Sequence, residues 1–138
     1  MAFQPRLILL HKQKTSGRVR YLCLPHGVLA FTPLPVLSAL RDEDFTSSLN
    51  FHPAALLQEA ESRLGLAAGS LEAEAEFQAW VDTPEGDVPI LLGAFTTIDP
   101  PFAEVEKVGG RFIALTEARA LSEVERNLLR RTYEHVLG

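Results

Sequence analysis

The stretch LEAEAEFQAWVDTPEGDVPILLGAFTTI, residues 71–98, decides the fold, because a turn divides it into two strand-like halves. Apolar side chains occupy every second position over residues 71–81, and mostly polar side chains lie between them. An alternation with a period of two predicts a strand with one buried face. A helix is the alternative, since alanine and glutamate favour helices, but it would leave no apolar stripe. We therefore predict a strand over residues 71–82.

The turn TPEG, residues 83–86, joins the two halves. Proline fixes φ at the first central position, and glycine accepts a positive φ. Two registers are open across this turn. Hydrophobic matching favours Val81 opposite Val88, whereas turn chemistry favours Thr83 opposite Asp87. The choice matters, because a slip of one residue exchanges the two faces of a strand.

The second half, residues 88–98, is apolar on both faces. Such a pattern predicts a strand that is covered on both sides. Either the chain's own helices cover both sides, or a second subunit covers one of them. An exposed tryptophan beside this strand would mark an interaction surface, so Trp80, Leu91 and Phe95 are the candidate interface residues.

Composition limits the class of protein. At 138 residues, with 46% hydrophobic and 22% charged residues, we expect one α+β domain over residues 1–138. A formal net charge of −5 argues against general nucleic-acid binding, and we interpret the basic hairpin tip of His11, Lys12, Lys14, Arg18 and Arg20 as a solvated tip. We expect no membrane segment, because no apolar run is long enough for a bilayer. Residues 1–10 lack the cleavage site of a signal peptide, so we expect a cytoplasmic protein.

The remaining elements follow from local signals. Two strands form an N-terminal hairpin, and a helix begins at a proline and ends at a glycine. Ser122 and Glu125 have the spacing of a capping box at the start of the last helix. The expected elements are strands 6–13 and 18–24, a helical turn 36–40, helix 50–64, a short helix 102–108, strand 111–116 and a helix from residue 122. The predicted fold class is α+β, a mainly antiparallel sheet of about five strands with two principal helices packed on it.

Candidate chemistry centres on His26, because it lies in a glycine-containing turn at a strand end, where functional residues are common. None of the four histidines has a neighbour at metal-ligand spacing, so we predict no metal and no cofactor. Cys23 precedes His26 by three residues and could form a nucleophile–base pair with it. We expect an inert core cysteine instead, because Cys23 shares the apolar face of Val19 and Tyr21.

Two further residues are candidates because they lie at strand ends. Asp99 follows the buried strand and precedes two prolines, which could hold a functional acid on a rigid corner. Arg111 follows a glycine pair, and glycine amides beside a cation can bind phosphate. No glycine-rich nucleotide motif accompanies them. We treat Asp99 as a weak catalytic candidate with His26, and Arg111 as a ligand-binding candidate.

Two functional hypotheses follow. The first is a small cytoplasmic, non-catalytic binding or accessory protein, acting as a homodimer or with a protein partner through an apolar sheet face at Trp80 and Phe95. The second is a small enzyme or ligand-binding domain whose pocket gathers His26, Asp99 and Arg111. An interface without a pocket would support the first hypothesis, and a cavity into which the three polar groups converge would support the second.

Overall fold

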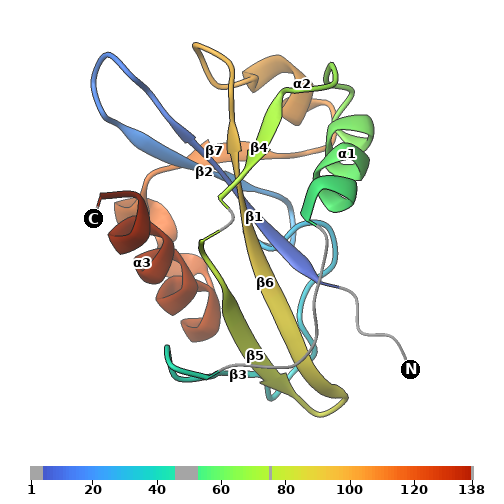
Figure 1. Cartoon of the computed structure of the whole chain (residues 1–138), viewed down its shortest axis with the longest axis vertical. Coiled ribbons are helices and arrows are strands. Elements are labelled where there is room, and N and C mark those ends of the chain that lie inside the picture. The colour runs from blue at the N-terminus through green and yellow to red at the C-terminus, as the bar shows by residue number, and fades with distance from the viewer. Residues whose placement is uncertain (1–4, 46–52, 75, 138) are drawn as a thin grey trace.

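A computed structural model describes residues 5–45, 53–74 and 76–137, and in these ranges one mixed sheet of seven strands lies between helices (Figure 1). The strands are β1 (Arg6–Lys12), β2 (Val19–Cys23), β3 (Ala39–Leu40), β4 (Leu71–Ala73), β5 (Ala79–Thr83), β6 (Gly86–Phe95) and β7 (Arg111–Ile113). The helices are α1 (Pro53–Arg63), α2 (Phe102–Glu106) and α3 (Glu123–Leu137), with a 3-10 helix η1 (Leu115–Ala120). The α+β class is therefore confirmed. None of the described helices is long and apolar enough to cross a bilayer.

The sheet has the order β3-β5-β6-β1-β2-β7, and β4 pairs with β6 beyond the end of β5. At its centre β1 and β6 run parallel, with Leu7 opposite Leu91 and Leu10 opposite Ala94. The other pairings between described strands are antiparallel. The expectation of about five strands missed the short strand β3, the division of the strand 71–82 into β4 and β5, and this parallel pair. Both central strands are continuous apolar runs, as strands covered on both faces are.

The hairpin of β5 and β6 has the register that hydrophobic matching favoured. Val81 lies opposite Val88, and Thr83 lies opposite Gly86, so two residues form the loop. The alternative with Thr83 opposite Asp87 is wrong. The Thr83 hydroxyl donates a hydrogen bond to the Gly86 carbonyl at 2.6 Å, which closes the turn.

The strand predicted over residues 71–82 is interrupted. Ala73 lies opposite Gly93 in β4, and Ala79 lies opposite Ile90 in β5. The chain therefore advances six residues from Ala73 to Ala79, while β6 advances only three between their partners. The extra residues between β4 and β5 must bulge out of the sheet. The Phe77 amide donates to the Glu74 carbonyl within this excursion. Ala75, which the alternation placed on the buried face, lies outside the described residues.

Helices of the same chain cover both faces of β6 (Figure 1). Ile90 and Leu92 belong to the core beneath α3, together with Leu128 and Leu129. On the opposite face, Leu91 and Phe95 pack with Leu57, Ala60 and Leu64 of α1. The close approach of α1 depends on Gly93, because a Cβ there would lie 2.7 Å from the Leu57 Cδ2 atom.

The three residues proposed for an interface are all inside this core. Trp80 is 3% exposed, and Leu91 and Phe95 are buried as well. Trp80 packs edge-on against Phe45, with ring centroids 6.1 Å apart. The apolar excess of β6 is thus covered within the chain, which removes the reason for expecting a second subunit there.

Helix α1 begins at Pro53 and is followed by Gly65 with φ 69°, as predicted. The predicted residues 50–52 lie outside the described residues. Glu61 is buried, and its carboxylate accepts a hydrogen bond from the Leu71 amide at 2.9 Å. The helical turn expected over residues 36–40 is wrong at its end, because Ala39 and Leu40 form β3 and pair with β5.

A buried tyrosine links the sheet to α3. The Tyr21 hydroxyl lies 3.0 Å from Thr132 Oγ1 and 3.4 Å from the Leu129 carbonyl oxygen. Burial raises the pKa of Tyr21 to about 12, although the Thr132 hydroxyl acts in the opposite direction. Since the unfolded pKa is 10.0, the stability contributed by the neutral phenol is complete below pH 10 and is lost toward pH 12.

We therefore expect wild type to lose about 1.4 kcal/mol more stability than Tyr21→Phe between pH 9 and pH 11. The Phe variant lacks this titrating group but keeps the ring. Urea unfolding followed by circular dichroism at both pH values measures the difference. Equal losses for the two proteins would show that Tyr21 titrates alike in the folded and unfolded chains.

Candidate functional site

A hollow of about 350 Å³ lies between the segment 33–38 and the start of α3, and we name it the His26–Glu125 hollow. Its walls are mostly apolar, and its only ionisable described residues are His26 and Glu125. The lining residues are His26, Pro33, Leu34, Pro35, Val36, Leu37, Ser38, Ala120, Leu121, Ser122, Val124 and Glu125. The hollow has the size and the mixture of apolar wall and few polar groups that small-molecule sites show.

Glu125 reaches the hollow from the first turn of α3. Its amide donates to the Ser122 hydroxyl at 3.3 Å, and its carboxylate accepts from the Ser122 backbone amide. These two contacts form the capping box that the sequence predicted. The Glu125 carboxylate also packs directly on the Cα of Gly27, where any Cβ would overlap its oxygens. The capping box and the turn at Gly27 together fix the position of the carboxylate.

His26 lies in the turn that follows β2, next to Gly27. The backbone groups of Leu24 and Gly27 bond to each other in both directions, at 2.8 and 3.0 Å, which closes the turn. The His26 Nε2 atom lies 2.6 Å from the Leu29 carbonyl oxygen, so Nε2 carries a proton and donates it. One ring nitrogen of His26 is therefore engaged with the backbone, and the ring is held at the edge of the hollow.

Glu125 is only 7% exposed, and no ion pair between described residues includes it. Burial raises its pKa, while the Ser122 amide and the neighbouring His26 lower it. A carboxyl group whose folded pKa is raised contributes stability below its unfolded pKa of 4.5, and this contribution is lost as the pH rises through the folded pKa. The ionised carboxylate therefore costs stability at neutral pH.

The variant Glu125→Gln should consequently gain stability relative to wild type as the pH rises from 4 to 7. Glutamine keeps the size of the side chain and can still accept the Ser122 amide in the capping box. Thermal unfolding across this pH range measures the difference. Glu123→Gln, on the same helix turn but exposed, is the control and should show no such trend. A constant offset between Glu125→Gln and wild type would contradict the cost assigned to the charge.

Cys23 lies beside this site but is not equipped as a nucleophile. It is buried, and burial raises the pKa of its thiol, opposed by Arg111 and reinforced by Glu125. The Cys23 Sγ atom lies 3.6 Å from the Leu24 carbonyl oxygen. A thiol with a raised pKa is a poor nucleophile, as the sequence indicated for a cysteine on an apolar face.

The structure does not gather the three residues of the alternative hypothesis. Arg111 lies opposite Cys23 on β7, at the same end of β2 as His26, but it does not line the hollow. Asp99 lies at the other end of the β1–β2 hairpin, where it accepts a hydrogen bond from the Gln13 side chain at 3.1 Å. The length of β2 therefore separates Asp99 from His26.

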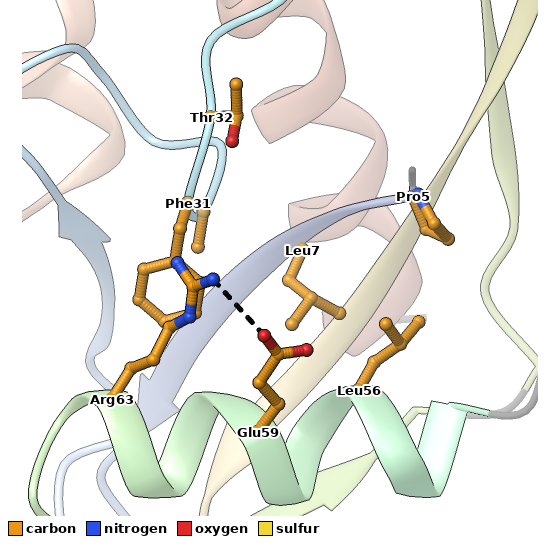
Figure 2. A pocket seen from close by; sticks show the side chains of 8 residues that line it. Pro5, Leu7, Phe31, Thr32, Leu56, Glu59 and Arg63 are labelled. Carbon is orange, nitrogen blue, oxygen red and sulfur yellow. Dashed lines mark ion pairs between the residues drawn. The ribbon is translucent and has the colours of Figure 1, made fainter. Parts of the chain in front are cut away.

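A second, smaller hollow of about 180 Å³ lies between α1 and the segment 30–32 (Figure 2). Arg63 and Glu59 project into its mouth from α1 and form an ion pair at 3.2 Å. The Arg63 guanidinium also stacks 4.9 Å from the centroid of the Phe31 ring. Because its two charges satisfy each other in solvent-exposed positions, the described lining of this hollow has no unmatched charge to define a ligand.

The sequence named His26 but missed the rest of the site. Glu125 was assigned only a capping role, and Leu121 and Val124 were not named as site residues. A serine followed three residues later by a glutamate indicates the start of a helix. This local signal does not show that the turn at Gly27 packs against the Glu125 carboxylate. Gly27 was the available hint, because a glycine next to a histidine can mark a close approach of another chain segment.

Comparison with known proteins does not assign a function to this chain, so the functional argument rests on the geometry of the site. No protein-family model matches the sequence, and no curated protein is significantly similar to it. Within residues 5–45, 53–74 and 76–137, no three histidine, cysteine, aspartate or glutamate side chains are grouped so that they could hold a metal ion.

Proposed function

We propose that this chain is a non-catalytic binding protein and that the His26–Glu125 hollow receives a small molecule with a largely apolar body. The proposal keeps the binding role expected from the sequence and moves it from the sheet face to the hollow. A cytoplasmic location is part of the same proposal.

The rim of the hollow carries the proposal. Val36 and Leu37 are 83% and 88% exposed, although each borders the apolar wall. Leu37 has a φ of 65°, a backbone conformation that costs a bulky residue about 1–3 kcal/mol. The Ser38 hydroxyl donates to the Pro35 carbonyl at 2.5 Å and braces this conformation. Strained backbone that presents apolar side chains to solvent is typical of a binding surface.

The polar groups of the site support binding rather than catalysis. The Nε2 atom of His26 donates to the Leu29 carbonyl, so only Nδ1 could accept a proton, and no hydrogen bond between described residues joins Nδ1 to a nucleophile. Cys23 has a raised pKa, and Asp99 lies at the other end of β2. A nucleophile–base pair would need two such groups within hydrogen-bond distance of each other.

The test is a titration with 2-phenylethanol, a compact neutral probe, followed by 1H–15N chemical shifts. We expect saturable shifts at the amides of Leu34, Leu37, Leu121 and Val124. Ala120→Trp should weaken them, because the larger side chain fills the hollow. The matched control Ala103→Trp places the same side chain on α2, away from the hollow, and should leave binding unchanged.

Two outcomes would contradict the proposal. Saturable shifts confined to residues around Phe31 and Arg63 would place binding in the smaller hollow. Shifts that Ala120→Trp leaves unaltered would show that the probe does not occupy the His26–Glu125 hollow.

A further inference from the structure

We infer that the natural ligand of the His26–Glu125 hollow is a small organic ammonium ion, whose cationic nitrogen pairs with the Glu125 carboxylate while its apolar body lies on Leu34 and Leu121. The inference rests on the proposed function and deepens it, because it names the chemical class of the ligand. It follows from the charges inside and around the hollow.

The carboxylate of Glu125 forms no ion pair with a lysine or arginine among the described residues, and His26 is its titratable neighbour in the hollow. The described lining of the hollow includes no lysine or arginine. The nearest arginine on α3, Arg126, donates to the Leu121 carbonyl at 2.5 Å and to the Arg119 carbonyl at 3.4 Å. Arg111 lies on β7 and acts on the Cys23 thiol. The Ser122 amide and the His26 ring are therefore the polar groups that offset the charge of Glu125.

A buried carboxylate without a lysine or arginine beside it is costly, and the cost falls when a cation pairs with it in the same low-dielectric setting. The surroundings here are suited to such a pair, because Glu125 is only 7% exposed and burial strengthens the attraction between charges. An anionic ligand would instead meet Glu125 as a like charge. The sign of the ligand's charge is thus set by Glu125.

The nature of the cation follows from the number of ligating groups and the size of the hollow. One carboxylate and one histidine are too few to hold a metal ion, which takes four or more ligands. A volume of about 350 Å³ accommodates a compact organic molecule. An ammonium group supplies three N–H donors, and a carboxylate accepts through two oxygens.

The experiment compares two probes of the same shape, phenethylammonium and neutral 2-phenylethanol, by chemical-shift titration at pH 7. We expect phenethylammonium to bind wild type about 10-fold more tightly, as a charge-assisted hydrogen bond would give. Glu125→Gln should bind both probes equally, and Glu123→Gln should keep the wild-type preference. The preference should also shrink toward pH 4, because Glu125 becomes protonated while the ammonium stays charged.

The outcomes separate this inference from the proposed function. Equal affinities of the two probes for wild type, with shifts around the hollow, would overturn the ammonium assignment and leave the binding function intact. Binding of neither probe would overturn both. Tighter binding of the tripeptide acetyl-Gly-Lys-Gly-amide than of phenethylammonium would overturn the small-molecule assignment, because the cation would then be a lysine of a partner protein.

Discussion

Replacing Trp80 by alanine is expected to lower the free energy of unfolding by about 3–5 kcal/mol and to leave the number of subunits unchanged. The indole is almost fully buried against Phe45, so its removal leaves a cavity that the neighbours cannot fill. Urea unfolding followed by circular dichroism gives the stability. Light scattering of the same samples gives the number of subunits.

Ile98→Ala is the control for this prediction. Ile98 is an apolar side chain with high exposure, and its truncation should change stability by no more than about 0.5 kcal/mol. A Trp80→Ala protein that keeps its stability but changes its subunit number would contradict the structure. Such a result would restore the sheet-face interface that the sequence suggested.

The second large effect is expected at Gly27. Gly27→Ala should lose about 3–5 kcal/mol, because φ at this position is 138° and the added methyl group would overlap the Glu125 carboxylate. Gly17→Ala is the matched control. Gly17 also has a positive φ, of 70°, but a Cβ there would meet no atom within 4 Å, so only the backbone cost of about 1 kcal/mol remains. Chemical denaturation of both variants measures the two costs.

A double variant separates the steric part of the Gly27 effect from the backbone part. When Glu125→Ala is combined with Gly27→Ala, the overlapping carboxylate is gone, so the second substitution should cost less than it does in wild type. Additive losses would mean that Gly27 and Glu125 do not touch, and the described packing of the Glu125 carboxylate on Gly27 would then be wrong.

Local and cross-strand signals predicted much of the fold. Val81 opposite Val88 followed from hydrophobic matching, and the limits of α1 followed from Pro53 and Gly65. The parallel pairing of β1 with β6 was not predicted, because it joins segments about 80 residues apart, and nothing in one apolar run specifies its partner. The interruption after Ala73 also depends on tertiary pairing, since it arises where two strands share the edge of β6.

The candidate site was less predictable than the fold. His26 was recognisable from its turn, and Glu125 from its capping box, yet their approach depends on how the turn after β2 packs on α3. Asp99 and Arg111 looked equivalent in sequence, because Asp99 follows a predicted strand and Arg111 begins one. The strand directions decide which end of the sheet each occupies, and they separate Asp99 from His26.

The most direct test of a binding hollow is an isotope-filtered nuclear Overhauser experiment on 13C-labelled protein with unlabelled 2-phenylethanol. The structure predicts contacts from the phenyl protons to the methyl groups of Leu34, Leu121 and Val124. Contacts restricted to the methyl groups of Leu7 and Leu56, which line the smaller hollow, would contradict the assignment.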